Sequence, residues 1–267
     1  PLDLSYISEM AAHIPDDIRR KLFFPKETPG IPAYLSGRES MLRQVERRDI
    51  LLSYPYESIR PFLNLIKEAA NDRDVLSIKI TLYRIAKESK LAEYLILATE
   101  NGKDVTVLME LRARFDEQNN IEWASRLEKA GCRVIYGCGP YKVHSKVCLI
   151  TRRVRGKVHY ITQIGTGNYN ETTAALYTDL SLITADQGIG RDAADFFKNI
   201  DLDNLDASYR HLLVAPASLK SRILKLMDRE IEKGPEGKIV IKINSITDID
   251  IIDKLMKASC AGVKIDM

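Results

Sequence analysis

Lys142, His144 and Lys146 alternate with smaller side chains in one short segment of the sequence. A strand repeats every two residues, so this spacing predicts that the three side chains share one strand face. An imidazole between two ammonium groups is a poor structural choice, because the like charges disfavour its protonated form. The same arrangement suits a nucleophile that is neutral at pH 7 and attacks a phosphate held by those cations. His-x-Lys alone also occurs often by chance.

A glycine-rich turn follows this segment, at the end of a second predicted strand over residues 158–164. It contains Gly165 and Gly167, which let backbone amides approach a phosphate closely, and Asn168, which adds a side-chain donor. A plain turn explains such a stretch equally well when it is taken alone. The ordered combination of a His-x-Lys strand and a Gly-x-Gly-Asn turn is much rarer, and it predicts one phosphate site.

Arginines follow two further predicted strands. Arg84 comes directly after a strand over residues 75–82, and Arg112 and Arg114 come after a strand over residues 105–109. Open α/β sheets bind ligands at the carboxyl ends of their strands. Surface arginine is the simpler interpretation in isolation, but the nearby histidine motif favours phosphate binding for Arg84 and Arg114. Arg112 stays unassigned.

The elements that must position these residues alternate along the chain. Strand, helix, strand, helix, strand implies right-handed crossovers, and predicts an α/β fold with a mixed, largely parallel sheet flanked by helices. Further strands are predicted at 141–151, 158–164 and 179–184.

An internal repeat is visible when residues 75–109 are laid over residues 238–267. The strand-like starts of the two segments match, and each ends in a glycine-terminated helix and a second strand. The repeat predicts that a second, similar domain begins near the end of the chain. The alternative is that any two strand-helix-strand units look alike.

Composition limits the possible classes of protein. The chain has 267 residues, 45% hydrophobic and 29% charged, which is typical of a globular protein. A net charge of +3 is too small to indicate nucleic-acid binding through bulk electrostatics. No apolar run reaches the roughly 18 residues of a membrane span. Four cysteines without a Cys-x-x-Cys pair favour buried thiols in a reducing compartment, so we expect a cytoplasmic protein.

Together the histidine and glycine motifs resemble those of the phospholipase D superfamily. Thr151 stands where that superfamily usually has an acid, five positions after Lys146, which argues against an ordinary phospholipase or nuclease. Within the superfamily the chain is similar to polyphosphate kinases over essentially its whole length. The matching segments are 49–52, 78–84, 110–117, 144–146, 164–171 and 176–179.

The resemblance implies an activity and roles for the site residues. His144 would accept the γ-phosphate of ATP and pass it reversibly to inorganic polyphosphate, ADP being the other product. Arg84 and Arg114 match family arginines credited with the magnesium site. Since arginine has no lone pair for a metal, we expect both to grip phosphate oxygens around Mg²⁺. Tyr177 matches a nucleotide contact, and Lys146 with the Gly165 to Asn168 turn would stabilise charge on the transferring group.

The resemblance also predicts the organisation of the chain: the tail of a helical domain with a linker over 1–30, a phospholipase D-like catalytic domain over 31–211, and the start of a second one over 212–267. We expect a homo-oligomer when the protein is full length, and a second His-x-Lys beyond Met267. Two other functions remain open: a phospholipase D-type phosphodiesterase, or a fragment that binds phosphate without catalysis. The second follows because the chain holds one His-x-Lys, whereas two copies face each other in the superfamily.

Overall fold

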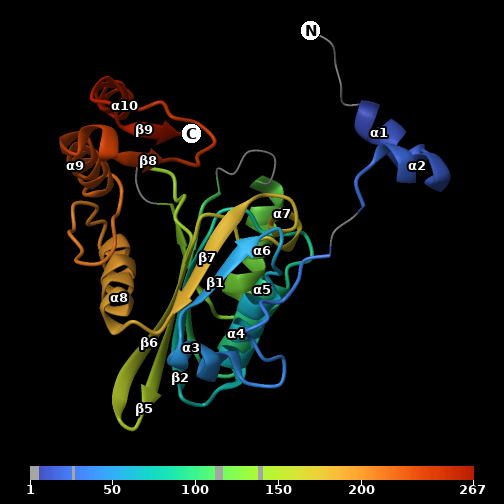
Figure 1. Cartoon of the computed structure of the whole chain (residues 1–267). Helices are drawn as coiled ribbons and strands as arrows, with labels where there is room; N and C mark the ends of the chain where they lie inside the picture. The colour runs from blue at the N-terminus through green and yellow to red at the C-terminus, as the bar shows by residue number, and fades with distance from the viewer. Residues whose placement is uncertain (1–5, 26–27, 112–116, 138–140) are drawn as a thin grey trace.

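A seven-stranded sheet forms the centre of the molecule in the computed structural model, which describes residues 6–25, 28–111, 117–137 and 141–267 (Figure 1). The strands lie in the order β1-β7-β6-β5-β2-β3-β4. Their bounds are β1 Ile50–Tyr54, β2 Val75–Leu82, β3 Asp104–Met109, β4 Arg133–Tyr136, β5 Val147–Val154, β6 Lys157–Gly165 and β7 Asp179–Thr184.

The sheet is mixed, which confirms the α/β class. β2, β3 and β4 are parallel, as the alternation of strands and helices predicts. The other four pairings are antiparallel, so the parallel part is smaller than predicted. One reason is the turn between β5 and β6, which consists of Arg155 and Gly156 with φ of 51° and 77°. Two residues with positive φ favour a tight hairpin, and a hairpin joins antiparallel strands.

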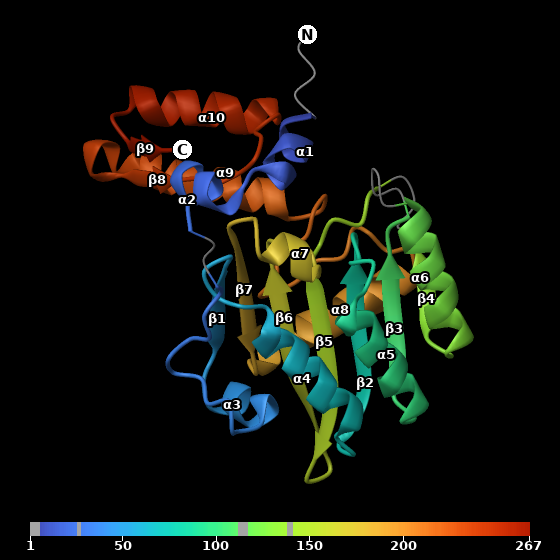
Figure 2. The same ribbon diagram turned by 90° about the vertical axis from the view of Figure 1, so that its right-hand side faces the viewer.

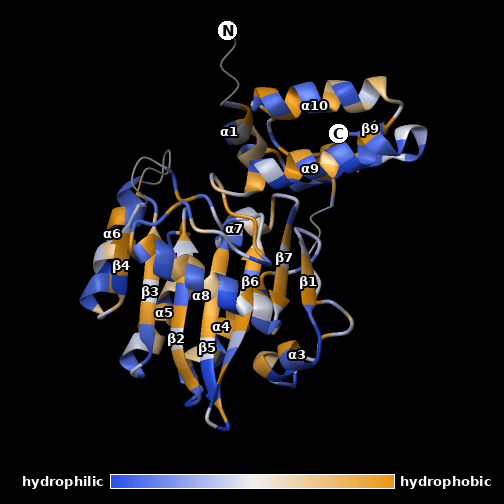
Figure 3. Ribbon diagram, turned by 90° about the vertical axis from the view of Figure 1, so that its left-hand side faces the viewer, coloured by the Kyte–Doolittle hydropathy of each residue, from blue (hydrophilic) through white to orange (hydrophobic). Residues whose placement is uncertain are grey.

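Helices cover both faces of the sheet. Figure 2 shows α4 (Arg60–Asn71) and α5 (Lys90–Glu100) in front of the strands, with α8 (Gln187–Asp201) behind, and Figure 3 shows the face that α8 covers. Strand residues alternate between two cores: Val107 belongs to the one beneath α4 and α5, and Leu108 to the one beneath α8. Burial on both faces explains why the central strands read as nearly continuous apolar runs.

Further helices lie at the ends and edges of this unit. They are α1 (Tyr6–His13), α2 (Asp16–Leu22), α3 (Met41–Arg47), α6 (Glu117–Lys129) and α7 (Glu171–Ala174). α1 and α2 lie away from the sheet, beyond the edge at which β1 ends (Figures 1 and 2).

The last part of the chain forms a second, smaller unit. It contains α9 (Leu219–Glu232), a 3-10 turn (Gly234–Glu236), β8 (Lys238–Val240), α10 (Ile249–Cys260) and β9 (Lys264–Asp266). β8 and β9 are parallel and are connected through α10, so this unit repeats the β2-α5-β3 connection. Across the described ranges, no helix is both long and apolar enough to cross a membrane.

Candidate active site

The predicted site residues that the structure describes follow or precede strands at one edge of the sheet. β2 and β3 end there with their carboxyl termini, as Figure 2 shows. β5 runs antiparallel to β2 and therefore begins at this edge, whereas β6, antiparallel to β5, ends there. β7 runs antiparallel to β6 and begins there too. Open α/β sheets bind ligands at such an edge.

The segment that carries His144 is not a strand. A strand over 141–151 was predicted, but β5 begins only at Val147. The hydroxyl of Thr81, at the end of β2, donates to the carbonyl of Ser145 (2.7 Å) and accepts from the amide of Val147 (3.1 Å). The Thr81 side chain thus binds backbone groups that a neighbouring strand would otherwise bind. The segment before Val147 can therefore leave the sheet. His144 is consequently exposed and Lys146 buried, and the two do not share a strand face as predicted.

His144 lies among cations and beside an aromatic ring. Its imidazole contacts the ring of Tyr83 in a T-shaped arrangement, with ring centroids 5.1 Å apart. Although much of the His144 side chain is exposed, its partial desolvation lowers its pKa below the ordinary 6.5, and the charges of Lys146, Arg84 and Lys142 lower it further. The imidazole is therefore neutral at pH 7, with a free lone pair, which is the state that a nucleophile needs.

Lys146 is the buried cation of the site, with 6% of its surface exposed. Its ammonium group donates to the carbonyl of His144 (2.5 Å). Burial lowers the pKa of Lys146 to about 8, the carboxylate of Asp179 opposes this change, and Arg84 adds to it. Lys146 thus remains mainly protonated at neutral pH and holds a positive charge beside the histidine.

The glycine turn approaches β7 closely. A Cβ atom on Gly167 would lie 2.7 Å from a carboxylate oxygen of Asp179, and one on Gly165 would lie 3.2 Å from the carbonyl of Leu180. A side chain at position 167 would therefore require Asp179 to move, and one at position 165 would press on the backbone of β7. The amide of Gly165 was predicted to bind phosphate. It instead donates to the carbonyl of Lys146 (2.9 Å) and so joins the end of β6 to the segment that carries His144.

Asn168 is held in place by its neighbour. The ring of Tyr169 is buried and stacks on Phe62 of α4, with centroids 5.1 Å apart. The Oδ1 atom of Asn168 is itself buried and has no hydrogen-bond partner among the described residues. Buried polar atoms are rarely left so, and an unpaired one marks a place for a ligand or a water molecule.

Asp179 is a site residue for which the sequence analysis assigned no role. Its carboxylate accepts a hydrogen bond from the hydroxyl of Thr166 (2.7 Å) and influences Lys146 electrostatically. The superfamily's usual acid is absent at Thr151, but Asp179 brings a carboxylate to the site from β7. Its place at the end of the matching segment 176–179 was the available signal.

Two buried residues beneath the site were also missed. Glu110, which follows β3, accepts a hydrogen bond from the amide of Val143 (2.9 Å), next to His144. Asn120 of α6 donates to the carbonyls of Tyr83 (2.7 Å) and Glu110 (3.0 Å). One asparagine thus ties together the chain segments that leave β2 and β3. Side chains that bind the backbone of distant segments leave no pattern in the sequence.

The remaining predicted residues differ in their placement. Arg84 adjoins the site, since its charge acts on both His144 and Lys146. Arg114 and the neighbouring Arg112 lie outside the described residues. Tyr177 is 61% exposed, in the loop between α7 and β7. The second unit reaches this loop, because the ammonium group of Lys242 lies 3.4 Å from the carbonyl of Thr178.

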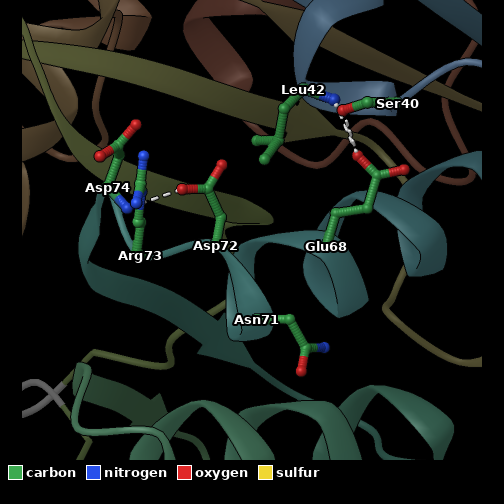
Figure 4. Close-up of a pocket in the computed structure, with 7 residues that line it drawn as sticks. All are labelled: Ser40, Leu42, Glu68, Asn71, Asp72, Arg73 and Asp74. Carbon is green, nitrogen blue, oxygen red and sulfur yellow. Dashed lines mark hydrogen bonds between the residues drawn. The ribbon is translucent and has the colours of Figure 1, made fainter.

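A hollow at the opposite end of the sheet does not belong to this site (Figure 4). It has a volume of about 460 Å³ and is lined by residues of α4, of the start of α3 and of the turn before β2. Glu68 accepts from the hydroxyl of Ser40 (2.7 Å), and Asp72 accepts from the amide of Asp74 (2.7 Å). These carboxylates fix the local chain.

The fold and the site define an α/β domain of the kind that binds a ligand at the carboxyl edge of its sheet. The family model for polyphosphate kinase C-terminal domain 1 matches residues 40–205, and that for polyphosphate kinase C-terminal domain 2 matches residues 212–267. The chain belongs to the polyphosphate kinase family.

Individual relatives agree with this assignment. The polyphosphate kinase of Staphylococcus haemolyticus is 43% identical over 270 residues, covering 100% of this chain and 37% of that protein. That of Bacillus cereus is 41% identical and is covered to 38%. The crystal structure of polyphosphate kinase from Porphyromonas gingivalis has a TM-score of 0.83 at 36% identity, covering 95% of this chain and 43% of that one. The chain spans little more than a third of the curated relatives it matches.

Proposed function

We propose that this chain carries the phosphate-accepting half of an ATP:polyphosphate phosphotransferase, with His144 as the nucleophile. The observation that supports it best is a histidine at the edge of the sheet that contacts the ring of Tyr83 and whose pKa is lowered by partial desolvation and by three cations. The cations that prevent protonation of the imidazole also attract the phosphate that it would attack.

The transfer has two balanced steps. In the first, a ring nitrogen of His144 attacks the γ-phosphorus of ATP, an N–P bond forms, the bond to the bridging oxygen breaks, and ADP leaves. In the second, a terminal oxygen of polyphosphate attacks the phosphohistidine, the N–P bond breaks, and the chain is longer by one phosphate. The second imidazole nitrogen keeps its proton throughout, so the ring is cationic in the phosphohistidine and neutral again once the N–P bond has broken, and the sequence is reversible.

The other residues would bind charge. Lys146 and Arg84 would neutralise oxygens of the transferring phosphate, and their influence on the pKa of His144 supports this role. With the amide of Gly165 used internally, Gly167 and Asn168 are the better candidates for phosphate contacts from the turn. Arg114 and Tyr177 remain proposals from the family resemblance, for the phosphate end of ATP and for the nucleotide.

Mg²⁺ would arrive with the nucleotide. Among the described residues, no three His, Cys, Asp or Glu side chains are grouped as a metal site, but the carboxylate of Asp179 lies at the site. Mg²⁺ is commonly held by one or two carboxylates, substrate phosphates and water, and this donor set fits such binding. The ion would supply neutralisation of phosphate charge.

Substitution of His144 tests the proposal. In the full-length protein, His144→Ala should abolish both polyphosphate synthesis and acid-labile labelling by γ-³²P-ATP, because no other group would accept the phosphate. His159→Ala, which removes a histidine of β6 far from the edge, is the matched control and should leave both intact. Normal labelling of His144→Ala would refute the proposal, and hydrolysis of a phosphodiester by the unaltered protein would favour the alternative.

The 267-residue chain by itself should synthesise little polyphosphate, since the family resemblance places a second His-x-Lys outside it. Robust synthesis by this chain would contradict that expectation. A cytoplasmic location and a homo-oligomeric full-length protein stay predictions, and cell fractionation and light scattering would test them.

A further inference from the structure

The ring of Tyr83 lies at the centre of the group of charged residues around His144. Three partners surround it: the imidazole of His144, with centroids 5.1 Å apart, the ammonium group of Lys146 at 5.3 Å from the ring centroid, and the Arg84 guanidinium carbon at 5.7 Å.

The backbone around Tyr83 is fixed. Asn120 binds its carbonyl (2.7 Å), Asn119 binds that of Ile85 (2.7 Å) and the indole of Trp123 binds that of Ala86 (3.0 Å). Three side chains of α6 thus hold the loop that follows β2. A ring attached to a backbone fixed in this way has a defined place, which a mobile surface tyrosine lacks.

An aromatic ring can hold cations without neutralising them. A carboxylate in the same place would attract Lys146 and Arg84 equally well, but its negative charge would repel an incoming phosphate. The face of a ring attracts cations through its quadrupole and carries no net charge. The positive charge of both residues therefore stays available to the ligand.

We propose that Tyr83 is a positioning residue, whose ring sets the spacing between the His144 imidazole and the cations of Lys146 and Arg84. This inference rests on the proposed phosphotransferase and adds a residue to its site. The ring carries the role, and the hydroxyl is dispensable. The groups that face His144 here are Lys142, Lys146 and Arg84.

Two substitutions separate ring from hydroxyl. Tyr83→Phe keeps the ring and should retain kcat in the full-length protein. Tyr83→Leu should lower kcat by about 100-fold, with the KM for ATP changed by less than about threefold, because misplaced reacting groups slow the transfer step rather than binding. Tyr83→Met is a second ringless variant in case the first does not fold. Tyr94→Leu, a half-buried tyrosine of α5, is the matched control and should behave as the unaltered protein.

A second readout requires no substrate. The pKa of His144, followed by NMR in the 267-residue chain and assigned with His144→Gln, should rise in Tyr83→Leu, because the imidazole becomes less buried and the cations move apart. It should stay unchanged in Tyr83→Phe and Tyr94→Leu. This measurement decides the role of Tyr83 even if the unaltered protein makes no polyphosphate, a result that would overturn only the proposed function.

Either of two results would overturn the inference. One is a ringless variant with an unaltered kcat and an unaltered pKa of His144. The other is a Tyr83→Phe variant impaired as strongly as Tyr83→Leu, which would assign the role to the hydroxyl.

Discussion

The β2-α5-β3 and β8-α10-β9 units have the same connection and very different surroundings. In both, the helix begins with a side-chain cap: Ser89 accepts from the amide of Ala92, and Asp248 from that of Ile251, each at 3.2 Å. Both helices end at a glycine in the left-handed region, Gly102 with φ of 75° and Gly262 with φ of 87°.

The strands of the two units differ. β2 and β3 have 8 and 6 residues and lie inside the seven-stranded sheet, whereas β8 and β9 have 3 residues each and only one another as partners. The comparison teaches that the caps and the crossover depend on local sequence, while long buried strands depend on neighbours. The residues proposed for the chemistry also differ: Tyr83 and Arg84 follow β2, whereas Ile246 and Thr247 stand at the same count from the first residue of β8.

The largest expected effect comes from replacing, by alanine, one residue that follows the first strand of each unit. Arg84→Ala should lower kcat for polyphosphate synthesis in the full-length protein by about 100-fold or more, because a charge that stabilises the transferring phosphate is lost. Thr247→Ala, at the corresponding position of the second unit, should leave the rate nearly unaltered. Equal losses in the two variants would contradict the assignment of the chemistry to the first unit.

The second expected effect concerns the helix that holds the first unit's strand ends together. Asn120→Ala should lower the free energy of unfolding by about 2–4 kcal/mol, because two buried carbonyls lose their donor. Asn119→Ala is the matched control, because it removes one such hydrogen bond from a less buried position. Its decrease in the free energy of unfolding, measured by urea denaturation, should be about half as large. Identical midpoints for Asn120→Ala and the unaltered protein would show that these bonds contribute nothing.

The pH dependence of the rate tests the role of Lys146, which lies beside the first unit in the segment before β5. The pKa of Lys146 is about 8, so its charge is lost as the pH rises through that value, and the rate should fall on that side. The rate should also fall at acid pH, below the lowered pKa of His144, where the imidazole becomes protonated.

Lys146→Arg isolates the alkaline limb of this profile. Arginine stays charged to a pH above about 12, so the alkaline limb should move upward while the acid limb stays. Lys142→Arg serves as the control and should keep both limbs. An alkaline limb that remains at about pH 8 in Lys146→Arg would exclude this lysine as its source.

The smallest expected effects test whether the two helix ends are equivalent. Gly102→Ala and Gly262→Ala should each lower the free energy of unfolding by about 1–2 kcal/mol, because alanine is strained in the left-handed region. The second loss should be slightly larger, since a Cβ atom there would lie 3.3 Å from a ring carbon of Pro235. Gly37→Ala, where a Cβ atom meets nothing within 4 Å, should be nearly neutral. If Gly102→Ala left the free energy of unfolding unchanged while Gly262→Ala lowered it, the two helix ends would not be equivalent.

These two units also show what could be predicted from the sequence. Caps, glycine-terminated helices and apolar strands are set by residues close together in the chain, and the repeat was visible for that reason. The strand predicted over 141–151 was wrong at its start because Thr81, which is distant in sequence, replaces its backbone partner. Glu110 and Asn120 were missed on the same grounds, since their roles depend on which backbone groups the fold brings beside them.

For the proposed site, the sequence indicated which residues lie near one another, and their roles stay predictions. His144, Lys146 and Arg84 do lie near one another, as their positions at strand ends imply. The sequence could not show that Lys146 would be buried beneath an exposed histidine, or that the amide of Gly165 would be used within the fold.

The hydroxyl of Thr81 shows how two strands of a sheet can separate to make room for a binding site. Where two strands separate, backbone groups on both sides normally lose their partners, which is unfavourable unless other groups satisfy them. Here one side chain both donates to the departing segment and accepts from it. The sheet can open at its edge without an inserted loop, and valine, which has the same shape as threonine but no hydroxyl, would leave the opening without its support.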